Sequence, residues 1–269
     1  MYIYGLLGEK LGHSLSPQIH KLIFEKLGVN GVYNLFEVNK KNLKDAVCGI
    51  KALNMKGINV TIPYKIETMK YIDEISKEAS KIGAINTIAI TNNELIGYNT
   101  DYYGFGMMLE KFNVDIKNKS IVVLGSGGAS KAVVQYLKDN DCSKIIIASR
   151  NMNEAKCKFK DCDIISYKQL NNICNSEIII NCTPIGMYPN TNKSTVEEDI
   201  LNKFKVSIDL IYNPLETLFL KKSKSVGNIC INGLYMLVGQ AIKSEELWNN
   251  IKIDKKVIDE IYSELIKII

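Results

Sequence analysis

The sequence predicts an α/β protein with two domains. Short apolar segments alternate with amphipathic stretches along nearly the whole chain, a pattern typical of strands and helices joined by right-handed crossovers. The apolar segments are continuous, as in parallel strands that helices cover on both faces. With 269 residues, the chain is long enough for one large or two smaller domains.

The first series of elements ends near residue 101. Ser16 and Pro17 favour a helix start, because a hydroxyl can cap free amides and proline fits a first turn. Asn92 and Asn93 are typical of a hairpin turn. We expect strands at 2–7, 32–38 and 57–62, helices at 17–27 and 43–53, short helical pieces at 66–72 and 75–82, and a hairpin of 84–91 and 94–99.

The second series begins near Gly104, where a turn precedes a helix. The helices from about residue 236 onward have no strand after them, so the pattern leaves open which domain they pack on. Asp254 is the expected N-cap of the last helix. We expect strands at 120–124, 144–148, 177–181 and 206–209, and helices at 130–140 and 254–269.

Composition excludes several classes of protein. Apolar residues make up 46% and charged residues 23%, as in soluble globular chains. The net charge of +5 is small and scattered, so it indicates neither nucleic-acid nor membrane binding, although it suits an anionic small molecule. No apolar run reaches 18 residues and no signal-peptide pattern opens the chain. Seven cysteines without a CxxC motif, beside only His13 and His20, predict reduced thiols, no metal site and a cytoplasmic protein.

A glycine-rich turn at 125–130 predicts a dinucleotide site. Its sequence, GSGGAS, joins an apolar strand to an amphipathic helix and is close to the turn that brings backbone amides to a pyrophosphate. Ser130 stands at the third glycine position and is small enough for helix–strand packing. A glycine turn without a ligand is the alternative.

The residues after the next strand favour NADP over NAD. NAD sites place an acidic residue there for the ribose diol, whereas this chain has Ser149, Arg150 and Asn151. Arg150 can bind a 2′-phosphate. The alternative is a solvated surface arginine.

Polar clusters follow the strand ends of the first half, where α/β proteins bind ligands. Their hydroxyls and amides suit a small polyhydroxylated, carboxylated ligand, and Lys65 with Asp101 can move a proton. Lys65 can instead be a surface lysine, and Asp101 or Ser16 a helix N-cap. Asn86 and Thr87 can be turn residues. The clusters cover residues 14–16, 59–65, 83–87 and 97–101.

Eight segments, spread over nearly the whole chain, carry a resemblance to a known family. They are GHSLSPQIH at 12–20, GINVTIPYK at 57–65, GAINT at 83–87, YNTDYYGF at 98–105, VLGSGGASKA at 123–132, NCTPIGMYP at 181–189, DLIYNPLET at 209–217 and NGLYMLVGQA at 232–241. In this order they resemble the shikimate dehydrogenases, which reversibly reduce 3-dehydroshikimate with NADPH in aromatic amino-acid biosynthesis.

The resemblance implies an N-terminal α/β substrate domain with a mainly parallel sheet, a Rossmann-like NADP domain, and C-terminal helices that return to the first domain. The domains would be 1–101 with 236–269, which binds substrate and holds the catalytic pair Lys65 and Asp101, and 102–235, which binds NADP. The substrate ligands would be Ser14, Ser16, Thr61, Lys65, Asn86, Asp101, Tyr212 and Gln240. The cofactor ligands would be Gly125, Ser126, Gly127, Gly128, Ala129, Ser149, Arg150, Asn151, Thr183, Leu210 and Gly233.

Two departures bear on specificity. The family often has a basic residue at the position of Glu154. Lys156 or Lys158 would have to substitute for that basic residue, and the preference for NADP over NAD would then be weaker. Ser16 favours shikimate, since family members that use quinate tend to carry threonine there.

Other readings stay open at this point. Tyr212 and Gln240 can be core or helix-face residues. The chain can be a quinate/shikimate dehydrogenase with dual cofactor use, a related dehydrogenase acting on a folate, or a catalytically silent ligand-binding homologue. The presence of both Lys65 and Asp101 argues against the silent homologue. We expect a monomer or homodimer with a small-molecule substrate.

Overall fold

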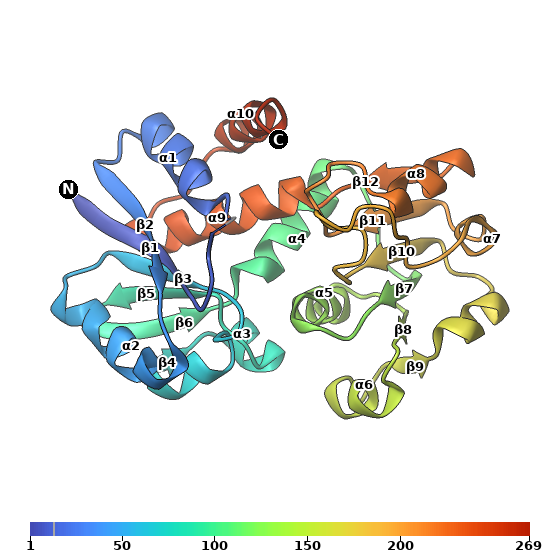
Figure 1. Ribbon diagram of the computed structural model, residues 1–269, viewed down its shortest axis with the longest axis horizontal. Helices are drawn as coiled ribbons and strands as arrows, with labels where there is room; N and C mark the ends of the chain where they lie inside the picture. The colour runs from blue at the N-terminus through green and yellow to red at the C-terminus, as the bar shows by residue number, and fades with distance from the viewer. Residues whose placement is uncertain (13) are drawn as a thin grey trace. The chain divides into compact units, whose positions relative to one another are not determined.

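The computed structural model describes residues 1–12 and 14–269, so His13 in the segment at 12–20 lies outside the described residues. The chain divides into two compact α/β units (Figure 1). Unit 1 comprises Met1–Gly104 and Val238–Ile268, and unit 2 comprises Phe105–Leu237 and Ile269.

Unit 1 contains a six-stranded sheet in the order β2-β1-β3-β5-β6-β4. Strand β1 pairs in parallel with β2 and β3, as β4 does with β6, whereas β5 is antiparallel to β3 and β6. The sheet is therefore mainly parallel, with antiparallel pairing at the predicted hairpin. The strands are β1 (Tyr2–Gly8), β2 (Gly31–Glu37), β3 (Gly57–Val60), β4 (Glu74–Ile75), β5 (Thr87–Thr91) and β6 (Glu94–Tyr98).

The hairpin turn confirms the expectation for Asn92 and Asn93. Their φ angles are 51° and 64°. A two-residue hairpin turn of type I′ requires positive φ at both central residues, and asparagine tolerates this better than most residues. The turn thereby sets the register of β5 against β6.

The C-terminal helices pack in unit 1. Helices α1 and α10, at opposite ends of the chain, lie side by side (Figure 1), and Lys26 of α1 forms ion pairs with Glu260 and Glu264 of α10. The helices are α1 (Ser16–Leu27), η1 (Lys40–Asn42), α2 (Leu43–Ala52), η2 (Glu67–Tyr71), α3 (Lys77–Ile82), α4 (Thr100–Lys111), α9 (Leu234–Asn249) and α10 (Lys255–Ile266), of which α4 and α9 continue into unit 2.

Two predicted helix starts have different outcomes. Asp254 is the N-cap of α10, and its side chain accepts a hydrogen bond from the Lys256 amide. The N-cap prediction for Ser16 is wrong, because α1 already includes Ser16 and the residue before it, Leu15, has helical backbone angles. The Ser16 hydroxyl is thus not used to start the helix.

Unit 2 contains a parallel six-stranded sheet in the order β12-β11-β10-β7-β8-β9. If β7 is counted as strand 1 and the sheet is followed from β9 to β12, the order is 3-2-1-4-5-6, as in dinucleotide-binding folds. Such folds bind ligands where the strand order reverses, which here is outside β7 and β10. The strands are β7 (Ser120–Leu124), β8 (Lys144–Ala148), β9 (Asp163–Ile165), β10 (Ile178–Asn181), β11 (Val206–Asp209) and β12 (Ile229–Ile231). The remaining helices are α5 (Gly128–Asp139), α6 (Met152–Lys158), η3 (Tyr167–Asn172), α7 (Glu198–Leu201) and α8 (Leu218–Ser225).

Within the described ranges, no helix combines the length and the apolar character needed to cross a lipid bilayer.

Candidate active site

Lys65 and Asp101 form a close ion pair in unit 1. The Lys65 Nζ lies 2.5 Å from the Asp101 Oδ2, and the two side chains are 27% and 19% exposed. Lys65 lies in the loop after β3, where its carbonyl accepts a hydrogen bond from the Ile85 amide. Partial burial strengthens the attraction between the charges while leaving both groups within reach of a ligand. The pairing and burial contradict the reading of Lys65 as a solvated surface lysine.

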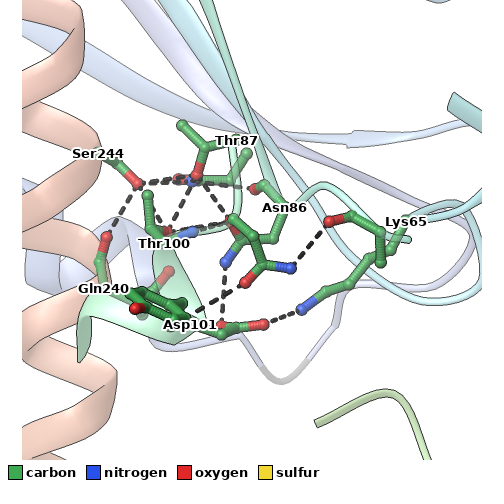
Figure 2. A network of polar contacts seen from close by, with 11 residues as sticks. Lys65, Asn86, Thr87, Thr100, Asp101, Gln240 and Ser244 are labelled. Atoms are coloured by element: carbon green, nitrogen blue, oxygen red, sulfur yellow. Dashed lines mark hydrogen bonds and ion pairs between the residues drawn. The ribbon is translucent and has the colours of Figure 1, made fainter. Parts of the chain in front are cut away.

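Asn86 holds the second carboxylate oxygen of Asp101 (Figure 2). Its Nδ2 donates to Asp101 Oδ1 at 3.0 Å, while its Oδ1 accepts from the Thr100 amide at 2.6 Å and from the Thr100 and Thr87 hydroxyls at 3.1 Å. Because a backbone N–H can only donate, the amide oxygen must face Thr100 and the amide nitrogen must face Asp101. Asn86 therefore fixes the orientation of the carboxylate rather than forming a turn.

Asn99, not Asp101, caps helix α4. The Asn99 Oδ1 accepts a hydrogen bond from the Tyr102 amide at 3.4 Å, and the Thr100 amide is bound by Asn86. The N-cap alternative for Asp101 is therefore wrong. Both Asp101 oxygens instead face side-chain donors, namely Lys65 and Asn86.

The other predicted substrate residues lie at several places. Ser14 and Ser16 are neighbours, and the Ser14 Oγ accepts from the Ser16 amide at 3.2 Å. Thr61 follows β3, and its amide donates to the Leu7 carbonyl. Gln240 lies on α9, where its carbonyl accepts from the Ser244 hydroxyl at 2.9 Å, and Figure 2 shows it beside the Asp101 network. Tyr212 lies in unit 2, where burial raises its pKa.

Three further residues, which the sequence reasoning did not assign to the site, join this network. Ser244 is fully buried, and its Oγ lies 2.9 Å from the Asn59 Nδ2 and 3.1 Å from the Thr87 Oγ1. Asn59 belonged to a predicted polar cluster, and Tyr33 donates to its Oδ1 at 2.7 Å. The sequence does contain a signal for Ser244: it is a small polar residue in an apolar helix, and it lies one turn after Gln240, on the same face.

A pocket of about 290 Å³ in unit 2 includes residues at the carboxyl ends of β7, β8 and β10. It contains seven predicted cofactor residues: Gly125, Ser126, Gly127, Ser149, Arg150, Asn151 and Thr183. Its other lining residues are Glu154, Lys158, Tyr167, Cys182, Pro184 and Ile185. The other predicted cofactor residues, Gly128, Ala129, Leu210 and Gly233, do not line it. Gly233 packs on Leu210, since a Cβ at Gly233 would lie 1.9 Å from the Leu210 carbonyl oxygen.

The glycine turn fits the phosphates of a dinucleotide. Gly125 has φ +98°, and a Cβ there would lie 2.8 Å from the Thr183 Cγ2, so glycine is required. At Gly127 and Gly128 no other group lies within 4 Å of where a Cβ would be. Helix α5 begins there without an acidic residue in its first turn. A pyrophosphate can therefore approach the free amides of this helix.

Charged side chains surround one end of the pocket. Lys158 Nζ lies 2.5 Å from the Glu154 Oε1 and 3.4 Å from the Ser126 carbonyl oxygen, and this pairing lowers the pKa of Glu154. Burial and the nearby Lys158 charge lower the pKa of Lys131. Burial raises the pKa of Tyr167 to about 12, against the opposing charge of Arg150. Of the two lysines considered as substitutes at this end, Lys158 lines the pocket and Lys156 does not.

Asp209 ends β11 in a buried cluster. Its carboxylate accepts hydrogen bonds from the Thr217 hydroxyl at 2.6 Å, the Asn181 amide at 3.0 Å and the Ile211 N–H at 3.1 Å. Burial nevertheless raises the pKa of Asp209 to about 6 from its usual 3.8. The ionised carboxylate therefore costs stability at neutral pH, and the cost disappears once the group is protonated.

The raised pKa of Asp209 predicts how the free energy of unfolding changes with pH. As the pH falls from 7 to 4, the folded protein takes up a proton at Asp209 before the unfolded chain does. The wild type should therefore gain about 2–3 kcal/mol of unfolding free energy relative to Asp209→Asn over this range. Urea unfolding followed by circular dichroism at pH 7, 5.5 and 4 measures the difference (pH values chosen to bracket the pKa of about 6). Parallel pH profiles for the two proteins would contradict it.

Among residues 1–12 and 14–269, no group of three or more His, Cys, Asp or Glu side chains is arranged to hold a metal ion.

Comparisons with known proteins place this geometry in a family. The family model "Shikimate dehydrogenase substrate binding domain" matches residues 6–88, and "Shikimate / quinate 5-dehydrogenase" matches residues 107–211. A shikimate dehydrogenase (NADP(+)) of Clostridium perfringens is 51% identical over 98% of both chains. A chorismate mutase/shikimate 5-dehydrogenase fusion protein from Clostridium acetobutylicum has a solved structure that is 53% identical, with a TM-score of 0.97 over 99% of this chain and 98% of that one. A shikimate dehydrogenase solved in complex with NADP+ is 40% identical, with a TM-score of 0.90 over 98% of this chain and 95% of that one. The chain belongs to the shikimate dehydrogenase family.

Proposed function

We propose that this protein is an NADP-dependent shikimate dehydrogenase, an oxidoreductase that reversibly reduces 3-dehydroshikimate to shikimate in aromatic amino-acid biosynthesis. The Lys65–Asp101 pair carries the proposal, because it places a proton donor and an orienting carboxylate 2.5 Å apart in a polar, half-buried site. Relatives named as NADP(+)-dependent shikimate dehydrogenases over the full length support the same activity.

The chemistry divides between cofactor and protein. NADPH, when bound, supplies the hydride. Lys65 donates a proton to the oxygen of the substrate ketone as that oxygen gains negative charge, and in the reverse direction it accepts the proton from the hydroxyl. Asp101 keeps the Lys65 Nζ in place, and Asn86 keeps Asp101 in place.

The remaining contacts bind and orient the substrate. We assign the Ser14 and Ser16 hydroxyls to its carboxylate, since each hydroxyl has a proton that a carboxylate can accept, although the Ser14 oxygen also accepts from the Ser16 amide. Thr61, Asn86, Tyr212 and Gln240 bind its ring oxygens. Ser16 favours shikimate over quinate.

The pocket of unit 2 binds the cofactor. The amides at 125–129 hold the pyrophosphate, and Ser149, Arg150 and Asn151 surround the adenosine ribose and its 2′-phosphate. Thr183, Leu210 and Gly233 complete the site. Residues 1–101 with 236–269 accordingly form the substrate domain, and 102–235 the NADP domain.

Steady-state oxidation of NADPH in the presence of 3-dehydroshikimate tests the function. We expect rapid turnover, with slower turnover when NADH replaces NADPH or when the reverse reaction starts from quinate. Faster oxidation of quinate than of shikimate would overturn the substrate assignment. Ligand binding without turnover would instead identify a silent homologue.

Glu154 favours a second candidate, an enzyme with dual cofactor use. Its carboxylate lies 2.5 Å from the Lys158 Nζ at the pocket end that would receive the 2′-phosphate. A carboxylate repels a phosphate and can accept a hydrogen bond from the 2′-hydroxyl of NAD. The ratio of kcat/KM values for NADPH and NADH decides between strict and dual use.

Lys158 is the second cation that we assign to the 2′-phosphate. Lys158→Ala should weaken binding of 2′,5′-ADP about threefold to tenfold, a modest loss because the lysine is partly exposed and shared with Glu154. Isothermal titration with 2′,5′-ADP and with 5′-AMP measures the effect. Lys156→Ala is the matched control on the same helix and should bind as the wild type does. Equal losses in the two variants would remove Lys158 from this role.

We further propose a cytoplasmic enzyme that is a monomer or homodimer. All seven cysteines are free thiols, which supports a reducing compartment.

A further inference from the structure

We infer that Tyr33 is a positioning residue for the Lys65–Asp101 pair, acting through a chain of hydrogen bonds that begins at its own hydroxyl. The inference rests on the proposed function, which assigns that pair to catalysis. The chain runs from Tyr33 through Asn59, Thr87 and Asn86 to Asp101.

The direction of the chain is fixed first at Asn59, which is 5% exposed. Its amide group lies 3.3 Å from the Asn86 carbonyl oxygen, which can only accept, so the Asn59 nitrogen must face that oxygen. The Asn59 oxygen then faces Tyr33, whose hydroxyl must donate to it at 2.7 Å. Burial raises the pKa of Tyr33 well above its usual value, so the hydroxyl keeps this proton.

Beyond Asn59, the chain leads to the catalytic pair (Figure 2). The Asn59 Nδ2 donates to the Thr87 hydroxyl at 2.9 Å, and this hydroxyl lies 3.1 Å from the Asn86 Oδ1, to which it donates. Asn86 in turn donates to Asp101 at 3.0 Å. The Ser244 hydroxyl donates to the Gln240 carbonyl, so it is a third acceptor near the Asn59 nitrogen, beside the Asn86 carbonyl and Thr87, and leaves the direction unchanged.

The Tyr33 hydroxyl is therefore coupled to the orientation of Asp101. Without the Tyr33 hydroxyl, the Asn59 oxygen loses its donor, and only the acceptors around its nitrogen still hold that amide toward Thr87. Asn86 then loses one of the donors that fix its own amide toward Asp101. The expected result is a displaced carboxylate and a lysine that donates its proton less effectively.

Tyr33→Phe tests the inference, with Tyr4→Phe as its matched control. Both tyrosines are buried in the same aromatic cluster, but the Tyr4 hydroxyl donates to Asn249 Oδ1, outside the chain. Tyr33→Phe should lower kcat about threefold to tenfold and increase the deuterium isotope effect from [4-²H]NADPH, with KM for NADPH unchanged. Tyr4→Phe should change kcat less than about twofold.

Thr87 supplies a second test, independent of the aromatic packing. Thr87→Val should lower kcat as Tyr33→Phe does, and Thr87→Ser, which keeps the hydroxyl, should restore it. Equal kcat values and isotope effects in Tyr33→Phe and Tyr4→Phe, or no recovery in Thr87→Ser, would overturn the inference while leaving the proposed function intact. Lack of wild-type turnover with 3-dehydroshikimate would instead overturn the proposed function.

Discussion

Replacing Lys65 with alanine should lower kcat for 3-dehydroshikimate reduction by about 10²–10⁴, with little change in KM. The lysine Nζ is the half-buried proton donor closest to the oriented carboxylate of Asp101, at 2.5 Å. Its loss removes the proton that the developing alkoxide needs, while the hydroxyls and amides that we assign to ground-state binding remain. Steady-state kinetics at saturating NADPH measure both parameters.

Lys65→Arg distinguishes the proton that Lys65 donates from its positive charge, and Lys70→Ala is a control. Lys65→Arg keeps a cation beside Asp101 but cannot release a proton, so its kcat should be nearly as low as that of Lys65→Ala. Lys70→Ala removes an exposed lysine that pairs with Glu67 in the same unit and should leave kcat unchanged. A near-normal kcat in Lys65→Ala would remove Lys65 from its proposed role.

Arg150→Ala should weaken NADPH binding about tenfold to a hundredfold while changing NADH binding little. Arg150 lies at the end of β8 in the pocket, and no acidic residue occupies the adjacent positions 149 and 151 that would bind a ribose diol. A guanidinium forms strong, paired hydrogen bonds with a phosphate, and NADH has no phosphate at this position.

Fluorescence titration of the two reduced cofactors measures this difference directly. Lys160→Ala removes an exposed cation of unit 2 that does not line the pocket and controls for the general loss of positive charge. Equal loss of affinity for both cofactors would contradict a contact between Arg150 and the 2′-phosphate.

The sequence predicts long elements better than short ones. Strands β7, β8 and β11 have the predicted bounds. A continuous apolar run makes up most of β7 and β8, whereas Ser207 and Asp209 interrupt the apolar pattern of β11. Strands β4, β9 and β12 have only two or three residues, too few to establish a period, and were not predicted. Helix α5 begins two residues before its predicted start, since its glycine has low helix propensity and its position is set by the turn.

The candidate site shows the same limit at the level of side chains. Strand ends indicate where Lys65 and Asp101 lie, since ligand-binding groups gather there in α/β folds. Nothing local indicates that Tyr33 donates to Asn59 or that Ser244 on α9 contacts both Asn59 and Thr87. Such partners are 26 to 185 positions apart, and only the packed fold brings them together.

At the start of α4, the residue that caps the helix, Asn99, differs from the residue that pairs with Lys65, Asp101. Asn99 supplies the capping oxygen, and Asn86 binds the Thr100 amide, so neither of these helix-start hydrogen bonds uses Asp101. A substitution at position 101 therefore removes partners of Lys65 and Asn86 but no capping hydrogen bond of α4. This arrangement makes the site evolvable, because new activities can be sampled without first compensating for a damaged fold.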